Sequence, residues 1–232
     1  MSGSIGTMNE GSLHAALKSW YAEPDDRIEV PVDGFIVDIV RGEMLIEIQT
    51  RSFASMKKKL LSLVEQYCVR LVYPIPRDKW IIKVLDDETA EVTRRKSPKH
   101  GRWVDVFDEL VSFPQLMLSP NFELDIVLIQ EEEIWCRATG RAWRRRGWKV
   151  VDRLLLDVVE QRRFESRDDL LGLLPDNLDD PFTTSDIAKL LGRPRRLAQR
   201  AAYCLREMGA ILPVGKTGNA ILYARQDATQ EM

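Results

Sequence analysis

The stretch of residues 27–51, RIEVPVDGFIVDIVRGEMLIEIQTR, constrains the fold of this chain more than any other segment. Its apolar and β-branched residues reach the density that is typical of strands in a buried sheet. Two turn signals interrupt it, Asp33-Gly34 and Arg41-Gly42. Asp-Gly in particular suits a two-residue hairpin turn, because such turns require positive φ. The segment therefore predicts three short strands joined by two tight turns.

Polar side chains gather on one face of the second predicted hairpin. With residues 41–42 as a two-residue loop, Asp38 lies opposite Leu45. Because side chains alternate between faces and paired residues share one, Asp38, Glu47 and Gln49 fall on the same face. A buried carboxylate is costly unless a cation lies nearby, so packing alone gives no reason for this arrangement.

These residues resemble the PD-(D/E)XK nuclease superfamily, which has the restriction-endonuclease-like fold. That family carries Asp on the first strand of a hairpin and Glu-x-Lys on the second, and Asp38 and Glu47 occupy those places. Gln49 stands where the family usually has lysine, although some restriction enzymes of the superfamily carry glutamine there. The elements expected next are a helix and two apolar segments, at about 52–67, 69–74 and 80–84. The resemblance covers roughly the first half of the chain.

The resemblance implies a site for Mg²⁺ or Mn²⁺ held by Asp38 and Glu47. Such an ion takes oxygen ligands and lowers the pKa of a bound water. Gln49, together with Lys57, would orient that water and stabilise the charge of the reacting phosphate. If residues 33–34 do not form a turn, Asp33 becomes a rival of Asp38 as the metal ligand.

Lys57 belongs to a run of three lysines in the predicted helix 52–67. On a helical wheel Lys57 falls on the apolar face, whereas Lys58 and Lys59 point away from it. An inward lysine could replace the cation that is missing at Gln49. Alternatively, its stem packs at the margin of the apolar face and its amine reaches water.

A first helix is predicted for residues 9–22, where apolar residues recur at helical spacing until Pro24. Glu10 lies at the N-terminal end of its inward face. Many nucleases of the superfamily place an acidic residue on such a helix near the metal, which makes Glu10 a candidate metal ligand. Thr7 and Glu10 also have the spacing of a capping box, in which Glu10 satisfies a backbone donor. Both interpretations remain open.

The middle of the chain predicts further nucleic-acid contacts. The basic loop 94–102 suits either phosphate contacts or plain exposure to solvent. A strand at 122–130 is expected to close the first domain. The composition then changes, because residues 137–153 hold seven basic residues and one acidic residue. This segment and a helix at 150–164 predict a basic, helical connector over residues 131–180.

A compact second module begins after the acidic linker 175–181. Thr183-Thr184-Ser185-Asp186 opens a helix that runs to Leu191, and a turn leads to a second helix that stops at Gly209. Two strands follow, at 210–214 and 220–224. Helix, turn, basic helix and hairpin together resemble a winged helix-turn-helix domain.

The second helix of this module carries its basic side chains on the outward face. Such a helix usually enters the major groove of double-stranded DNA. The candidate DNA-binding residues are Arg195, Arg196, Gln199, Arg200 and, on the wing, Lys216. Winged helices also serve as protein-interaction modules, which is the alternative interpretation.

Composition excludes several classes of protein. A net charge of −2 over 232 residues gives no whole-chain signal for a polyanionic partner, so a nucleic-acid surface must be local. The three cysteines show no metal-ligand spacing and predict reduced thiols. No apolar run approaches the ~20 residues of a membrane span, and the N-terminus lacks the features of a signal peptide. We therefore expect a cytoplasmic protein without a membrane partner, and a homodimer is a candidate assembly.

The sequence thus predicts an α+β protein with two folded parts. Residues 9–130 form a restriction-endonuclease-like α/β/α core with a mixed sheet, and residues 181–226 form a small winged-helix domain. A disordered lead, the connector and a tail occupy 1–8, 131–180 and 227–232. Two functions follow: a magnesium-dependent DNA endonuclease, or a catalytically inactive nuclease fold that binds DNA or regulates. The presence of both carboxylates favours the endonuclease. Gln49 favours the inactive nuclease fold, because an amide carries no positive charge.

Overall fold

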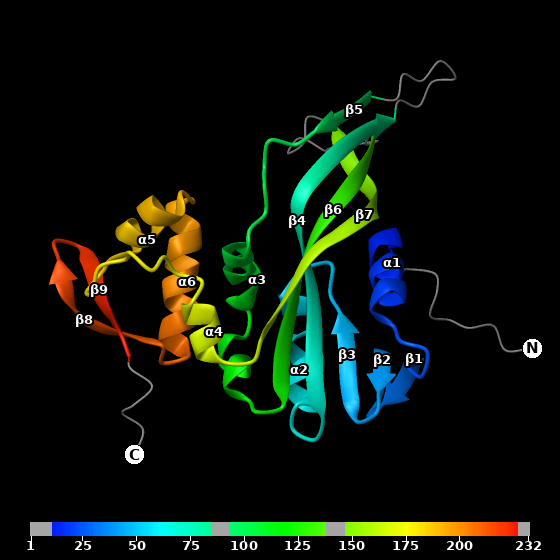
Figure 1. Cartoon of the computed structure of the whole chain (residues 1–232), viewed down its shortest axis with the longest axis horizontal. Coiled ribbons are helices and arrows are strands. Elements are labelled where there is room, and N and C mark those ends of the chain that lie inside the picture. Colours follow the sequence, from blue (N-terminus) through cyan, green and yellow to red (C-terminus); the bar gives the residue numbers. More distant parts are fainter. Residues whose placement is uncertain (1–10, 85–92, 138–146, 227–232) are drawn as a thin grey trace, which may run out of the picture.

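The computed structural model describes residues 11–84, 93–137 and 147–226 of the chain. It is an α+β fold built on a mixed seven-stranded sheet, in which β1, β2, β3, β4, β6 and β7 lie in that order and β5 pairs with β4 (Figure 1). A separate two-stranded sheet, β8 and β9, lies in the C-terminal part. Glu10, the predicted lead and the predicted tail lie outside the described residues. None of the described helices is long and apolar enough to cross a membrane.

The three predicted antiparallel strands are present as β1 (Arg27–Val32), β2 (Phe35–Arg41) and β3 (Met44–Ile48). Asp33 and Gly34 form the expected turn, with φ of 47° and 79°. Asp33 therefore lies outside strand β2 and is not the rival of Asp38.

The second turn differs from the prediction by one residue. Arg41 pairs with Met44, so the loop is Gly42 and Glu43 rather than residues 41–42. Gly42 has a φ of 58°, and the first central position of a II′ turn favours glycine for that reason. Leu45 pairs with Val40 rather than with Asp38, and the pairing ends at Ile39 and Ile46, before Asp38 and Glu47 are reached.

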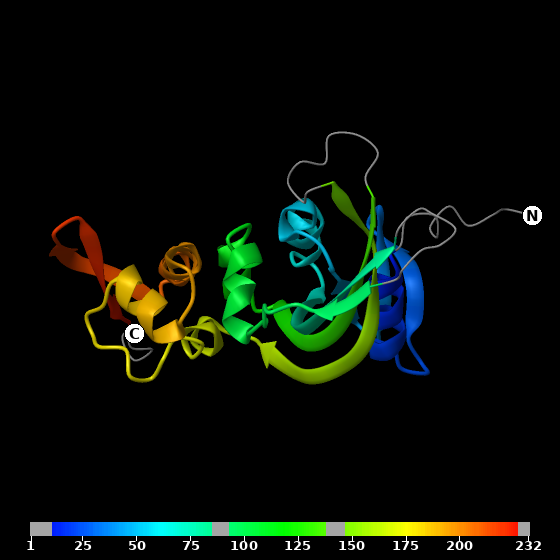
Figure 2. The ribbon, with the colours of Figure 1, turned by 90° about the horizontal axis from the view of Figure 1, so that it is seen from above.

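Two long parallel strands, β4 (Cys68–Val84) and β6 (Phe122–Arg137), form the centre of the sheet. Their curvature is plain from above (Figure 2). The sequence predicted two separate apolar segments here, 69–74 and 80–84, whereas the structure has one strand that contains Pro74 and Pro76. The opposite edge of β4 pairs with β3 only up to Val72 and with β5 (Thr93–Lys96) only from Trp80. The prolines fall between these partners, where a missing N–H breaks no ladder on that edge.

The predicted connector is wrong in its first part. Residues 131–137 continue β6, and β7 (Trp148–Phe164) pairs antiparallel with β6 in place of the expected helix. The pairing shifts opposite residues 128–129, 130–131 and 134–135 of β6, and the extra residue of each bulge lies in β7. Such bulges interrupt the strict two-residue alternation, so the apolar residues of β7 fall at a spacing that mimics a helix.

Helices cover both faces of the sheet. Helix α1 (Ser12–Tyr21) packs on one face with Ile39, Ile46 and Ile48, and it begins at Ser12 rather than at residue 9. Short helical segments cover the other face. They are η2 (Phe53–Ser55), α2 (Lys57–Leu63), η3 (Trp103–Val106), α3 (Phe107–Leu110) and η4 (Pro114–Leu118). The helix predicted for 52–67 is therefore shorter than expected and is preceded by a 3-10 turn.

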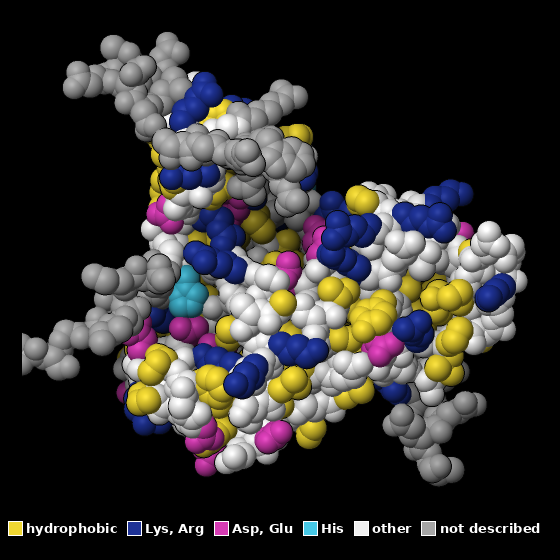
Figure 3. Space-filling model, turned by 180° about the vertical axis from the view of Figure 1, so that it is seen from behind, with side chains coloured by type: hydrophobic (Ala, Val, Ile, Leu, Met, Phe, Trp, Pro, Cys, Tyr) yellow, Lys and Arg dark blue, Asp and Glu magenta, His cyan; other side chains and the backbone are white. Residues whose placement is uncertain are grey.

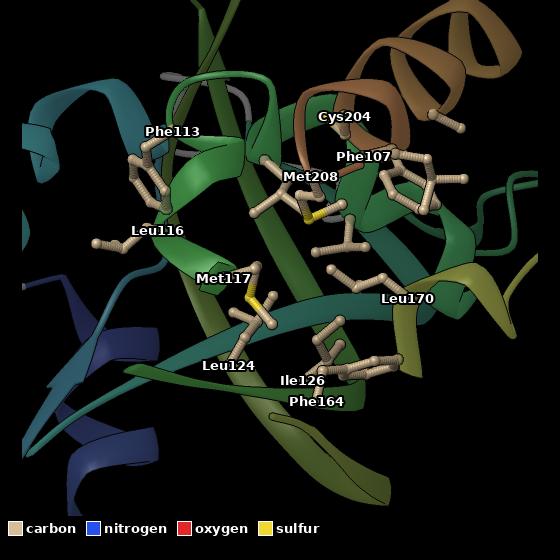
Figure 4. Packing of buried hydrophobic residues seen from close by; sticks show 14 of the residues in the cluster. Phe107, Phe113, Leu116, Met117, Leu124, Ile126, Phe164, Leu170, Cys204 and Met208 are labelled. Carbon is tan, nitrogen blue, oxygen red and sulfur yellow. The ribbon is translucent and has the colours of Figure 1, made fainter. Parts of the chain in front are cut away.

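The C-terminal part has the predicted order of helix, turn, helix and hairpin. After α4 (Arg167–Leu171), the elements are α5 (Thr184–Leu191), α6 (Arg195–Glu207), β8 (Ile211–Thr217) and β9 (Ala220–Arg225). Thr183 and Asp186 form a capping box, and Gly192, with a φ of 61°, ends α5. This part does not stand apart from the sheet. Side chains from α3, η4, β6, β7, α4 and α6 form one continuous core (Figure 4).

Candidate active site

The candidate site lies where strands β2 and β3 part from each other. Their pairing ends at Ile39 and Ile46, although β3 continues to Ile48. Beyond that point side chains replace the missing backbone partners. The N–H of Ile48 donates to Asp38 Oδ2 at 2.8 Å, and Lys59 Nζ donates to the carbonyl of Ile36 at 2.5 Å. The separation of the strands thus brings a carboxylate and an ammonium group between them.

Glu47 is the most deeply buried polar side chain at this point, with 1% of its surface exposed. Lys59 Nζ lies 2.5 Å from Glu47 Oε1 and forms an ion pair with it. Among the described residues, however, this oxygen has no partner with good hydrogen-bond alignment. Burial raises the pKa of Glu47 to about 7, and the Asp38 charge adds to the rise while Lys59 and His14 oppose it. Glu47 therefore changes protonation near neutral pH.

Asp38 is shifted in the opposite direction. Its side chain is 17% exposed, and His14 Nε2 lies 3.2 Å from Asp38 Oδ2. Burial alone would raise the pKa of Asp38. The contact with His14, the Ile48 N–H and the charge of Lys59 outweigh that effect, so the pKa lies below its ordinary value. Two neighbouring carboxylates with opposite shifts are a frequent feature of functional sites.

The lysine that reaches the carboxylates is Lys59, not Lys57. Lys57 and Lys58 are exposed, whereas Lys59 is half-buried. The helical wheel that favoured Lys57 treated Phe53 as part of the same α-helix. Phe53 instead belongs to a separate 3-10 turn, which rotates by a larger angle per residue than an α-helix does. Within α2 itself, Lys57 and Lys59 lie on opposite margins of the buried face, and strands β2 and β3 lie on the margin of Lys59.

Gln49 serves the loop after β3 rather than the carboxylates. Its Nε2 donates to the carbonyl of Ser52 at 3.2 Å and to Ser55 Oγ at 3.0 Å, and its Oε1 accepts the N–H of Arg51 at 3.1 Å. These contacts explain why an amide suits this position, since it both donates and accepts. Gln49 also lines the pocket beside Asp38, so its predicted role in orienting a water stays a prediction.

A pocket of about 740 Å³ opens beside Asp38, and Glu47 is not among its lining residues. Asp38 and His14 line it, together with Arg51 and Arg153. Sequence reasoning treated His14 as a packed histidine and did not single out Arg153, because nothing in the sequence placed β7 next to α1. The signal for His14 was its position on the inward face of the first helix.

Two acidic groups support the walls of this pocket. Glu29 has a φ of 53° and pairs with Lys18 at 2.7 Å. Asp152 on β7 accepts from the hydroxyl of Ser12 at 2.5 Å and from the backbone N–H of Ser12, at the start of α1, at 3.3 Å. Among the described residues, no group of three or more His, Cys, Asp and Glu side chains could hold a metal ion. The site therefore offers two carboxylates, Asp38 and Glu47, and the proposed third ligand, Glu10, lies outside the described residues.

The predicted DNA-binding residues of the C-terminal part separate into two groups. Arg195, Arg196, Gln199 and Lys216 are exposed. Arg200 instead points at α3, where it pairs with the carboxylate of Asp108 at 2.6 Å and donates to its carbonyl at 2.9 Å. The sequence could not show this, because the prediction gave α6 one buried stripe, whereas α6 packs on both α5 and α3.

Comparison with known proteins gives a family and a relative. A family model described as a domain of unknown function (DUF8091) matches residues 11–165. A protein of Treponema pallidum (strain Nichols), described as uncharacterized, is 32% identical over 226 residues, which cover 96% of this chain and 88% of that protein. No solved structure matches. The matched segment ends just after β7, so it spans the whole seven-stranded sheet and stops before α4.

Proposed function

The chain belongs to the DUF8091 family, and we propose that it is a metal-dependent nuclease that hydrolyses phosphodiesters of double-stranded DNA. One observation carries the proposal: Asp38, Glu47 and Lys59 come together from three different elements at the point where β2 and β3 part. Two carboxylates and one ammonium group, largely withdrawn from water, are the groups that metal-assisted phosphodiester hydrolysis requires.

The order of the elements supports this proposal. Helix α1, three antiparallel strands, helix α2 and a strand parallel to β3 follow one another, with α1 and α2 on opposite faces. This is the order expected from the resemblance to the PD-(D/E)XK nucleases. In that comparison Lys59 supplies, from α2, the positive charge that Gln49 lacks on β3.

The donor set fits a divalent cation such as Mg²⁺ or Mn²⁺. Asp38 and Glu47 offer carboxylate oxygens, which Mg²⁺ prefers, and Mg²⁺ is commonly held by one or two carboxylates plus water. Glu47 Oε1 is buried without an aligned hydrogen-bond donor, although Lys59 pairs with it. A second cation would offset the repulsion between the two carboxylates. When bound, the ion supplies a water of lowered pKa and Lewis-acid stabilisation.

The protein groups around the carboxylates have distinct roles in this proposal. The Ile48 N–H and His14 hold Asp38 in place and keep it ionised. Lys59 places its charge beside the phosphate, where negative charge grows in the transition state. Arg51 and Arg153, which line the pocket, hold the phosphodiester backbone near the carboxylates.

The C-terminal part would hold the DNA as a winged helix-turn-helix module. Arg195, Arg196 and Gln199 on α6 and Lys216 on β8 are exposed and available for contact. Arg200 is excluded from this set, because its guanidinium pairs with Asp108.

Metal-dependent cleavage of DNA by the full chain tests the proposal. The wild type, Asp38→Asn and Glu47→Gln are compared in thermal unfolding and in cleavage of duplex DNA, each with and without Mg²⁺ or Mn²⁺. Asp25→Asn is the matched control, because Asp25 is an exposed aspartate. The metal should raise the midpoint of the wild type and of the control by mass action, and both site variants should lose that rise and all cleavage. Cleavage that survives in both site variants would refute the proposal.

A DNA-binding protein without catalysis is the second candidate. Two observations favour it: Lys59 already pairs with Glu47, and Gln49 is occupied by its loop. Under this alternative, the wild type would bind duplex DNA but show neither a metal-induced shift nor cleavage.

A further inference from the structure

A second pocket, of about 840 Å³, lies between the sheet and the C-terminal part. Tyr73 and Lys79 of β4 line it, together with residues 98–102. Further lining residues lie around the start of α6: Arg193, Pro194, Arg196 and Leu197. The fold thus brings together two basic segments that lie far apart in the sequence, the loop after β5 and the beginning of α6.

The acidic side chains of this pocket are already engaged. Asp105 accepts from Arg193 at 2.7 Å, and Asp108 accepts from Arg200 at 2.6 Å. Glu109 accepts the N–H of Phe53 at 3.0 Å. Each carboxylate is therefore neutralised or hydrogen-bonded within the chain.

Three cations of the same pocket are exposed. They are Lys99, Arg102 and Arg196, and none of them makes an ion pair with another residue in the described part of the chain. The free charge of the pocket is consequently positive, even though the net charge of the whole chain is −2. A local excess of unpaired Lys and Arg is the electrostatic signature of a phosphate-binding surface.

A buried ion network joins this pocket to the one beside Asp38. Lys79, which lines the second pocket, lies 3.2 Å from Glu131, and Glu131 is fully buried. The charges of Lys79 and Arg153 both act on Glu131, and Arg153 lines the pocket beside Asp38. One residue of each pocket, Lys79 and Arg153, therefore acts on the same buried carboxylate. Figure 3 shows the molecule hollowed between the far end of the sheet and the C-terminal part, with Lys and Arg side chains on both sides of the hollow.

We propose that the pocket around Lys99, Arg102 and Arg196 binds the sugar-phosphate backbone of a DNA duplex whose neighbouring phosphates reach the candidate active site. The identification of the ligand as DNA rests on the proposed function. The lining favours a duplex over a single strand, because single-strand binders stack bases on exposed aromatic rings. The tyrosine here, Tyr73, packs edge-on against Phe53, with ring centroids 4.7 Å apart.

Binding of a short labelled duplex to the full chain tests this proposal. The binding is measured over a range of salt concentrations in EDTA, which prevents metal-dependent cleavage. Lys99→Gln, Arg102→Gln and Arg196→Gln should each weaken binding several-fold and lower the salt slope by about one unit. The triple variant should lower the slope by about three units. Arg27→Gln is the control, because it removes one exposed charge at β1, away from the pocket. A triple variant that binds like Arg27→Gln would overturn the proposal.

A second measurement guards against misfolded variants. Acylation of lysine amines in the wild type, read by mass spectrometry, should slow at Lys99 when duplex DNA is added and stay unchanged at the exposed Lys58. Equal reactivity of Lys99 with and without DNA, or tighter binding of an RNA duplex than of a DNA duplex, would overturn the assignment. Asp38→Asn should bind the duplex as the wild type does. Binding by the wild type without any metal-dependent cleavage would refute the proposed function and leave the binding pocket unaffected.

Discussion

Two carboxylates of one site differ in charge state at the scale of single residues. Burial raises the pKa of Glu47 to about 7. Asp38 is also buried, but His14, the Ile48 N–H and Lys59 keep its pKa below the ordinary value. One proton shared unequally between neighbouring carboxylates is the expected outcome when both cannot ionise easily. A divalent cation would favour the ionised form of Glu47 against the effect of burial, so metal binding should release a proton.

The raised pKa of Glu47 predicts how stability depends on pH in a metal-free buffer. The carboxyl ionises near its ordinary value of 4.5 in the unfolded chain and near 7 in the folded chain. The wild type therefore loses stability as the pH rises through this window, and Glu47→Gln does not. The advantage of the glutamine variant should grow by up to about 3 kcal/mol between about pH 5 and about pH 8.

Urea unfolding of the wild type and Glu47→Gln at both pH values measures this difference. Asp38 does not interfere, because its lowered pKa contributes stability that is lost only as the pH falls below its ordinary value of 3.8. An advantage of Glu47→Gln that is the same at both pH values would contradict the raised pKa.

At the scale of elements, local sequence signals predicted the three N-terminal strands well. The apolar density of residues 27–51 and the Asp33-Gly34 turn are local, so no tertiary information was needed. Neighbouring strands carry Asp38 and Glu47, as predicted, but Asp38 contacts His14 of α1 whereas Glu47 pairs with Lys59 of α2. Lys59 could not be identified, since two margins of α2 were equivalent until the position of β2 and β3 was known. Strand β7 was missed because bulges within it disturb the alternation.

Amide exchange distinguishes the observed strand β7 from the helix that its sequence suggests. Strand β7 ends the order of the sheet and pairs with β6 on one side. An edge strand points about every second N–H toward its partner, so protection should alternate along residues 154–164 in NMR hydrogen exchange. A helix would protect consecutive amides. A continuous run of slow amides in this segment would contradict the sheet.

At the scale of the whole molecule, one apolar core links the sheet to the C-terminal part. Phe164 at the end of β7, Leu170 of α4 and Met208 after α6 are all buried in it. Arg193 and Arg200 add ion pairs to Asp105 and Asp108 across the same junction. The family match stops within this core, at residue 165.

The continuous core predicts that the chain unfolds as a single cooperative unit. Calorimetry of the wild type should give one transition whose calorimetric and van't Hoff enthalpies agree. Phe164→Ala should destabilise that single transition by about 3–5 kcal/mol, the usual cost of removing a buried phenylalanine. Two separate transitions, with Phe164→Ala moving only one of them, would show that the two parts fold independently.

The rate of magnesium-dependent cleavage by Lys59→Met, compared with Lys57→Met, tests the central claim most directly. Both changes remove one positive charge from α2, but only Lys59 lies 2.5 Å from Glu47. Under single-turnover conditions with duplex DNA and Mg²⁺, Lys57→Met should cleave at the wild-type rate. Lys59→Met should be slower by about 100-fold or more, the usual loss when one group that stabilises transition-state charge is removed. Equal cleavage rates for Lys59→Met and Lys57→Met, or no cleavage by the wild type, would contradict the account.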